Sequence, residues 1–470
     1  MTTTAPPTAA PPVEPRRVRS PRSFGPLLLR LHFYAGVLVA PFLLVASLTG
    51  LAYVFAPQLE RAVYADELVV DAGAPARPLA EQVAAARAAH PEGALTAVRP
   101  GDGDATTQVD FTSPELDEEH QHTVYVNPYT GAVTGQLTTW WASTPLKTWL
   151  DDLHRNLHLG DVGRHYSEFA ASWLGVITVG GLILWWRRQR GNRTARALLT
   201  PDLSARKGVR RTRGWHAATG VWLTAGLLVL AATGLTWSRY AGENFSTAVD
   251  ALKGSRPSVS TALDGSAAPA GGGHHGGGAA PAGETVDPSA IDSVLKVARD
   301  NGLSGPVEIT VPEDAATAWS VGQNRNEWPV GRDVIAVDAA TGKVVDRVDF
   351  ADWPVLAKLT RWGINAHMGT LFGVVNQILL AALAVGLICV IVWGYRMWWQ
   401  RRPTRADRRA LAGAPPARGA WQQLPTWGVV AGVPAVVALG WALPLFGIPL
   451  AAFLLFDIAA GAIRRRRAPL

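Results

Sequence analysis

Long apolar segments constrain this chain more than any other feature, because about 20 consecutive apolar residues are enough to cross the hydrocarbon core of a bilayer. Such segments are predicted at residues 31–55, 166–186, 215–237, 371–395, 426–442 and 445–463. Prolines interrupt the last two, which form a tight pair. The sequence therefore predicts a membrane protein with an α-helical four-span bundle and a C-terminal two-span hairpin.

Clusters of arginine and lysine give the orientation of these spans, since such residues concentrate on the cytoplasmic side of a membrane. The clusters occupy residues 16–22, 187–196, 206–213, 401–409 and 464–467. All of them fall on one side of the predicted spans, so both termini are expected in the cytoplasm. The formal net charge of +7 is therefore interpreted as a topology signal, and no nucleic-acid partner is predicted.

Two polar regions, each more than 90 residues long, lie on the opposite side of the membrane. Each has an amphipathic helix pattern followed by three or four alternating strand patterns. The motifs "NPYTG" and "DAATG" supply the turn between the last two strands of each region. Two external α+β domains are therefore expected. A Gly-rich linker at 252–286 contains His274 and His275, which make a poor metal site on a glycine chain.

These patterns divide the chain into consecutive segments. The expected boundaries are 1–23 for a disordered basic tail, 24–57 for span 1, 58–148 for the first external domain, 149–190 for span 2, 191–213 for a basic cytoplasmic loop, 214–238 for span 3, 239–360 for the second external domain, 361–402 for span 4 and 403–470 for the C-terminal hairpin and basic tail.

The chain contains an internal duplication. An offset of 184 aligns "HFYAGVLVAPFLLVASLTGL" from His32 with "HAATGVWLTAGLLVLAATGL" from His216 without a gap. An offset of 213 aligns the two even-numbered spans and brings His154 onto His367. Each half therefore contains a span, an external region and a second span, with one histidine near the start of each span.

Four histidines repeated in register predict haem ligation, because neutral imidazole is a common axial ligand and facing helices of a bundle build such sites. His32 with His216 would hold a haem near the cytoplasmic face, and His154 with His367 one near the external face. No CxxCH motif occurs, so a b-type haem is expected, with two per chain. A closed zinc site is disfavoured because no cysteine or carboxylate recurs in register.

The segment "WLDDLHRNLHLGDVGRHYSEF" at 149–169 leaves the external ligand open. If it is one helix, His154, His158 and His165 share a face. From His154 to Trp185 such a helix would be about 46 Å long, against a hydrocarbon core of about 30 Å. Either it projects beyond the membrane or His154 lies on a bent segment, and His165 and His158 stay alternative ligands.

Small and basic residues near the histidines suit a macrocycle with propionates. The glycines expected to leave room are Gly36, Gly160, Gly220, Gly369 and Gly373. The arginines able to pair with propionates are Arg30, Arg155, Arg164, Arg213 and Arg361, although Arg30 and Arg213 serve the topology equally well.

With these motifs in view, residues 24–402 resemble the PepSY-associated transmembrane family, which consists of bacterial inner-membrane proteins linked to iron uptake and includes ferric-siderophore reductases. The resemblance is carried by "LLRLHFYAGVLVAPFLLVASLTGLAYVF", "VYVNPYTGAVTG", "LHRNLHLGDVGR" and "NAHMGTLFGVVNQILL". It implies a haem-dependent ferric reductase of the cytoplasmic membrane, with PepSY-like external domains, acting on a ferric siderophore or another ferric chelate. The C-terminal hairpin and the Gly-rich linker depart from the family pattern.

Other functions stay open at this point. No nucleotide-binding motif is found, so a quinol or a separate flavoprotein is the expected inner electron donor. A non-catalytic protein whose PepSY-like domains bind an external peptidase or sense the state of the envelope is the alternative. A metal permease is disfavoured, because Glu168 is the only acidic candidate in the four main spans.

Overall fold

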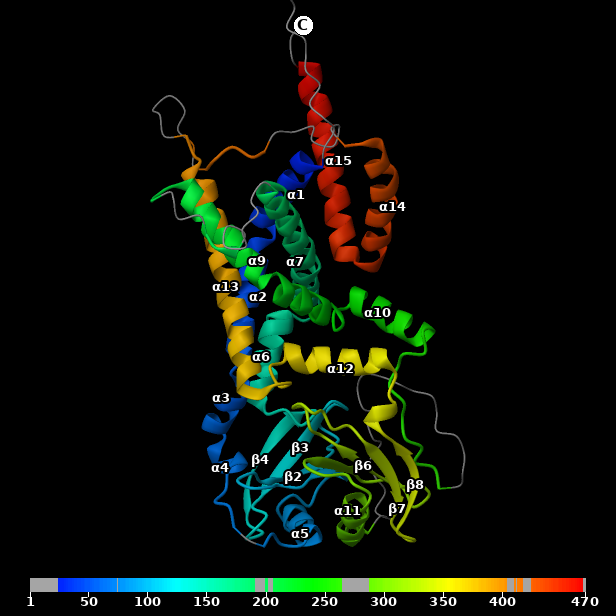
Figure 1. The fold of residues 1–470 in the computed structure, drawn as a ribbon. Helices are drawn as coiled ribbons and strands as arrows, with labels where there is room; N and C mark the ends of the chain where they lie inside the picture. The colour runs from blue at the N-terminus through cyan, green and yellow to red at the C-terminus, as the bar shows by residue number, and fades with distance from the viewer. Residues whose placement is uncertain are drawn as a thin grey trace, which may run out of the picture.

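The computed structural model describes residues 24–467, apart from residue 74 and the segments 191–198, 202–205, 264–286, 404–409, 411 and 417–423. A helical bundle stands over one face of a β-sheet, as Figure 1 shows. The predicted N-terminal tail and the paired histidines of the Gly-rich linker, His274 and His275, lie outside the described residues.

Most of the predicted spans are present as long apolar helices. Within the described residues, α7 (Gly160–Gln189), α9 (Val209–Leu235), α13 (Gly373–Gln400) and the apolar part of α15 (Pro444–Arg467) are long and apolar enough to cross a membrane. The first predicted span is the bent pair α1 (Gly25–Leu38) and α2 (Ala40–Tyr53), which gives a fifth candidate. Residues 426–442 form α14 (Thr426–Ala442), which is apolar but shorter.

The bend of 56° between α1 and α2 follows from Pro41. Proline has no amide hydrogen, so the carbonyl of Val37 loses the donor that a continuous helix would provide. The hydroxyl of Tyr395 on α13 donates to that carbonyl at 2.8 Å. The bend is therefore stabilised by a hydrogen bond from another membrane helix.

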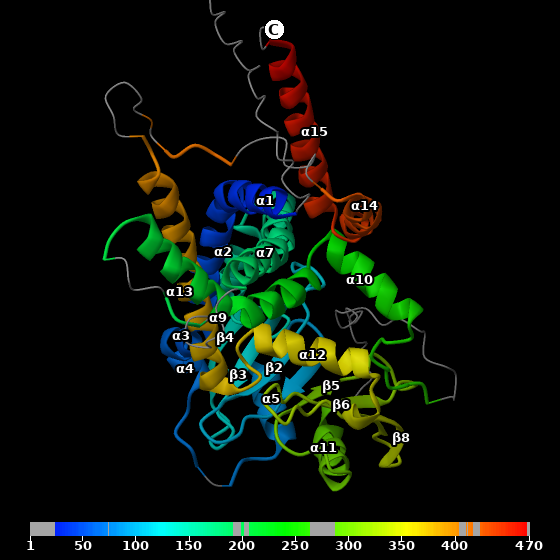
Figure 2. The same ribbon diagram turned by 45° about the horizontal axis from the view of Figure 1, so that its top comes forward.

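The C-terminal hairpin packs beside the bundle, on the side of α7 (Figures 1 and 2). Trp173 of α7 meets Phe446 of α15 with ring centroids 5.0 Å apart. Arg30 of α1, which is 2% exposed, forms an ion pair with Asp457 of α15, which is 7% exposed. Breaking a buried pair of this kind on one side is strongly destabilising. Arg30, one of the arginines that the sequence made able to pair with a propionate, has Asp457 as its partner in this structure.

In each polar region a helix is followed directly by four strands. The first region contains α5 (Leu79–Ala89), β1 (Leu95–Arg99), β2 (Thr107–Phe111), β3 (His120–Val126) and β4 (Val133–Trp140). The second contains α11 (Ile291–Asp300), β5 (Val307–Thr310), β6 (Trp319–Gln323), β7 (Val334–Asp338) and β8 (Lys343–Val348).

The predicted turns occupy equivalent places in the two regions. Between β3 and β4, the side chain of Asn127 accepts the backbone N–H of Tyr129 at 2.9 Å. Between β7 and β8, Asp338 accepts the N–H of Ala340 at 2.9 Å. Gly131 and Gly342 close these turns at φ values of 75° and 68°, which favour glycine because it has no Cβ.

The two regions do not form two separate domains, in contrast with the expectation. Their strands form one antiparallel eight-stranded sheet in the order β4-β3-β2-β1-β5-β6-β7-β8. Strand β1 pairs with β5, where Ala97 lies opposite Thr310 and Val98 opposite Ile309. An unpaired edge strand exposes hydrogen-bonding groups, so each half covers the edge that the other would leave open.

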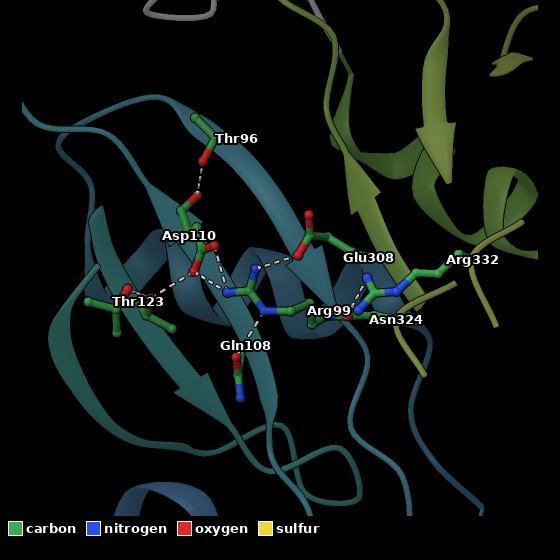
Figure 3. A network of polar contacts seen from close by, with 9 residues as sticks. Thr96, Arg99, Gln108, Asp110, Thr123, Glu308, Asn324 and Arg332 are labelled. Carbon is green, nitrogen blue, oxygen red and sulfur yellow. Dashed lines mark hydrogen bonds and ion pairs between the residues drawn. The ribbon is translucent and has the colours of Figure 1, made fainter. Parts of the chain in front are cut away.

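Side chains also join the halves. Arg99 on β1 donates to both carboxylate oxygens of Asp110 on β2, at 2.7 and 2.6 Å, and to Glu308 on β5 at 3.1 Å (Figure 3). Thr123 donates to the same Asp110 carboxylate at 2.7 Å. Burial alone would lower the pKa of Arg99, but the carboxylates of Asp110 and Glu308 outweigh burial and raise that pKa above its ordinary value.

Helices α5 and α11 cover the face of the sheet that points away from the bundle (Figure 1). Asp292 of α11 accepts the first backbone N–H groups of α5, from Leu79 at 2.7 Å and Ala80 at 3.0 Å. A carboxylate at this place satisfies helix donors that have no partner in their own helix. The two helices and both sets of strands share a single hydrophobic core.

Candidate functional site

His154 lies on a short helix of its own. Helix α6 (Pro145–Asn156) carries it, and the chain then turns through Leu157 and His158, both at a φ of 55°, before α7 begins at Gly160. The segment is therefore not one helix, so the three histidines do not share one helix face, and His154 lies on the bent segment that was the other possibility. The turn is tight, because a Cβ on Gly163 would lie 1.6 Å from the carbonyl oxygen of Asn156.

The second half of the chain repeats this break. Helix α12 (Val355–His367) ends at His367, and α13 begins at Gly373 after a turn that contains Gly369. Gly160, Gly369 and Gly373 all have positive φ, at 54°, 79° and 55°. These three glycines therefore allow the chain to turn, whereas the sequence suggested that they make room for a macrocycle. The excessive length of a continuous second span is also explained, since His154 lies beyond a break.

The four candidate histidines meet in the expected two pairs. The ring centroids of His32 and His216 are 6.3 Å apart, and those of His154 and His367 are 6.4 Å apart. All four side chains are half-buried. His216 and Thr233, which contacts His367, are 17 residues apart on the continuous helix α9, so the two pairs are separated by about 25 Å along it.

Threonine hydroxyls orient one pair. Oγ1 of Thr49 lies 3.0 Å from Nδ1 of His154, and Oγ1 of Thr233 lies 2.8 Å from Nδ1 of His367. Each hydroxyl also donates its hydrogen to a helix carbonyl four residues earlier, that of Val45 at 2.9 Å for Thr49. With that hydrogen engaged, the oxygen accepts from the imidazole Nδ1–H. The lone pair of each ring is then on Nε2, where a metal ligand requires it.

Backbone carbonyls face the other pair. Nδ1 of His216 donates to the carbonyl of Val390 on α13 at 2.9 Å. The carbonyl beside His32 is that of Ile177 on α7, at the position that the offset of 213 aligns with Val390. This contact is looser, because Nδ1 of His32 has no partner of hydrogen-bonding geometry within the described part of the chain.

A glycine lies against each ring. A Cβ would approach the imidazole Cε1 atom to 3.0 Å at Gly50, 3.4 Å at Gly234, 3.0 Å at Gly181 and 3.7 Å at Gly394. Gly50 and Gly234 follow the two orienting threonines, so a Thr-Gly dipeptide recurs at the same place in each half. Gly36 and Gly220 lie one turn along from His32 and His216, and a Cβ on either would meet no atom within 4 Å. Open space therefore lies beside this pair.

The alternative ligands have other partners. The two ring nitrogens of His165 lie 2.6 Å from the carbonyl of Asp161 and 3.0 Å from the hydroxyl of Tyr240. His158 is exposed and stacks on Trp149, with ring centroids 5.0 Å apart. Neither joins a histidine pair.

Two of the arginines considered for propionates also have partners in the chain. Arg155 contacts Asp151 and Asp152, and Arg164 donates to the carbonyl of Trp237.

The two rings of each pair lie at a distance at which they could hold one metal ion between them. With a metal–nitrogen bond of about 2.0 Å and a ring radius of about 1.1 Å, imidazoles on opposite sides of one metal have centroids roughly 6 Å apart. No group of three or more histidine, cysteine or acidic side chains that could hold a metal occurs in the described residues. Two protein ligands alone suit a metal whose other ligands come from a macrocycle, so the donor set fits haem better than zinc.

The protein-family model described as the PepSY-associated TM region matches residues 29–401 of this chain. The chain belongs to this family. No curated protein matches it. In this PepSY-associated protein the matched region includes both histidine pairs, both orienting threonines and the whole eight-stranded sheet. The hairpin of α14 and α15 lies beyond the match.

No role of Thr49, Thr233 or Val390 was predicted from the sequence. The Thr-Gly repeat was visible in the alignment of the two halves, and it could have suggested the two threonines.

Glu168, the single acidic candidate in the main spans, is only 1% exposed and accepts the backbone N–H groups of Tyr240 and Ala241 at 2.9 and 3.0 Å. It caps the start of α10 (Tyr240–Ala251), which is a structural role.

Proposed function

We propose that this protein is a haem-b membrane reductase, which passes electrons across the cytoplasmic membrane to a ferric siderophore or another ferric chelate outside. The observation that carries the proposal is the pairing of His32 with His216 and of His154 with His367 at centroid distances of 6.3 and 6.4 Å. A bis-histidine haem accepts and gives up one electron at a time through its iron.

Each residue around the pairs has a definite task in this proposal. Thr49 and Thr233 hold the rings of His154 and His367 in the tautomer that presents Nε2. Hydrogen bonds to Nδ1 also make an imidazole a stronger ligand. The glycines let each ring approach the neighbouring helix. The partial burial of the rings would influence the reduction potential of a bound haem.

The direction of transfer follows from the distribution of charge. The arginine clusters that end α7 and α13 and begin α9 lie at the end of the bundle away from the sheet (Figure 1). Assigning this end to the cytoplasm puts the His32–His216 level near the inner donor, a quinol or a flavoprotein. The sheet and the His154–His367 level then face the outside. One electron per ferric ion gives Fe(II), which hard oxygen ligands hold less tightly.

The first experiment is an absorption spectrum of the purified full-length chain, oxidised and dithionite-reduced, with a pyridine haemochrome count. We expect a low-spin b-type spectrum and two haems per chain. His154→Ala and His367→Ala should each remove one haem, and His32→Ala and His216→Ala the other. His165→Ala and His158→Ala are matched controls on the neighbouring segment, and we expect both to keep the full count.

A colourless protein from haem-replete cells would contradict the proposal. It would favour the alternative, in which the PepSY-like sheet binds an external peptidase or senses the envelope.

If haem is bound, stopped-flow mixing of the reduced protein with a ferric hydroxamate tests the substrate class. Reoxidation that accelerates with chelate concentration supports reduction of the chelate, and reoxidation by dioxygen alone would contradict it.

A further inference from the structure

A cavity of about 500 Å³ opens between α9 and α13. Its lining residues belong to the ends of these helices that lie away from the sheet (Figure 1). It lies where α9 begins and α13 ends. Arg206, Lys207, Arg211 and Arg396 line it, together with Trp215 and Trp393. Neither histidine pair is part of its wall, although Trp215 is the residue before His216.

Among the described residues that line this cavity, the charged side chains are all cationic. No aspartate or glutamate is among its described lining residues. The ion pairs found in the described part of the chain do not involve any of its four cationic side chains. Like charges gathered around one space repel one another. The backbone N–H groups that start α9 at Val209 add further positive potential. Such a space attracts an anion.

The aromatic side chains of the cavity are of the kind enriched at a membrane boundary. Trp215 and Trp393 pack together with ring centroids 5.9 Å apart, and Trp215 is 38% exposed. Tryptophan is enriched where a membrane helix leaves the hydrocarbon and meets the headgroups. The hydroxyl of Thr212 donates to Gln400 at 3.1 Å, which joins the two helices at the cavity wall. The cavity therefore has a fixed frame, and its tryptophans favour a position beside lipid headgroups.

We propose that this cavity binds a phosphate group, supplied by the headgroup of an anionic phospholipid. Basic pockets between membrane helices on the cytoplasmic side are suited to anionic headgroups. Arginine side chains bind phosphate oxygens through two parallel hydrogen bonds. A soluble phosphate compound has the same chemistry, but the position at the bilayer edge favours the lipid. The proposal does not depend on haem binding.

Native mass spectrometry of the full-length chain in detergent tests this site, with phosphatidylglycerol, phosphatidylcholine and inorganic pyrophosphate as probes. We expect phosphatidylglycerol to bind preferentially with a stoichiometry of one. The variant Arg211→Gln/Arg396→Gln should bind it about 30-fold more weakly, which is the loss expected when two basic residues are removed from beside a headgroup. Arg211→Lys/Arg396→Lys keeps the charge and should recover much of the affinity.

The matched control is Arg401→Gln/Arg402→Gln, which removes the same charge from the same end of α13 but outside the cavity wall. Its affinity should stay within about twofold of the unaltered chain. Binding of pyrophosphate in place of the lipid would support the phosphate site and assign it to a soluble ligand. Equal losses in both double variants, or no loss in either, would overturn the proposal.

Discussion

The hydroxyl of Thr49 lies 3.0 Å from Nδ1 of His154, although the two residues are 105 positions apart in the chain. Thr233 and His367 repeat this relationship at 2.8 Å in the second half. The duplication has therefore kept a histidine together with the residue that orients it. This conserved arrangement within one chain is what a ligand pair requires, because the tautomer of each imidazole must be fixed.

The first prediction concerns these hydroxyls. Thr49→Val and Thr233→Val keep the shape of the side chain but remove the acceptor for Nδ1–H. We expect haem binding at the His154–His367 level to weaken by about 10–100-fold, as is usual when a partner of a metal-binding histidine is lost. Haem titration of the apoprotein, followed by absorbance, measures the change.

Thr360→Val is the control for this substitution, because the Thr360 hydroxyl also donates to a helix carbonyl, that of Leu356 at 2.8 Å, and contacts no histidine of the pairs. It should leave haem affinity unchanged. Unaltered affinity in both Thr49→Val and Thr233→Val would show that the two hydroxyls do not orient ligands.

The second prediction concerns the open space beside His32 and His216. Gly36→Leu and Gly220→Leu introduce a side chain where a Cβ meets no atom within 4 Å. Leucine also favours helix over glycine by roughly 0.8 kcal/mol. We therefore expect each variant to fold and to lose the haem at this level only.

Circular dichroism and the haemochrome count together check this result. Gly432→Leu on α14, also in open surroundings, is the control and should keep both haems. A full haem count in Gly36→Leu and Gly220→Leu would contradict the assignment of this space to a macrocycle.

The third prediction concerns the joint between the two halves of the sheet. Arg99→Met leaves the carboxylate of Asp110, which is 1% exposed, without its cation. Removing one partner of a buried pair should lower the free energy of unfolding by about 3–5 kcal/mol. Thermal unfolding of the full chain in detergent, followed by the circular dichroism of the sheet, measures the loss.

Arg61→Met provides the comparison, because Arg61 and Asp104 form an ion pair with both side chains more than half exposed. Exposed pairs contribute only about 0–1 kcal/mol. If both substitutions changed the unfolding temperature equally, the Arg99 network would have no special role in joining the halves.

The fourth prediction concerns orientation. In a Cys389→Ser background, which removes the single cysteine of the chain, exposed Glu118 and Arg188 are replaced by cysteine. A membrane-impermeant maleimide should label Glu118→Cys in right-side-out vesicles and Arg188→Cys in inverted ones, because basic flanks stay cytoplasmic. The reverse pattern would require the electron path to run in the opposite direction.

The sequence by itself determined most of the long apolar helices, the turns and which histidines lie together. Apolar length and turn chemistry are local properties, so they can be read without a fold. The pairing of His32 with His216 and His154 with His367 followed from the duplication, because residues at equivalent places in two packed repeats are brought together by the repeat symmetry.

Only the tertiary structure decided the breaks after His154 and His367, the single sheet and the basic cavity. Each depends on contacts between residues far apart in sequence. The turn between α6 and α7, which Gly163 lies against, lets α6 pack on α2. There Thr49 contacts His154. The β1–β5 pair exists because two open edges meet. Hydropathy and spacing describe one segment at a time, so they do not show which distant segments contact each other.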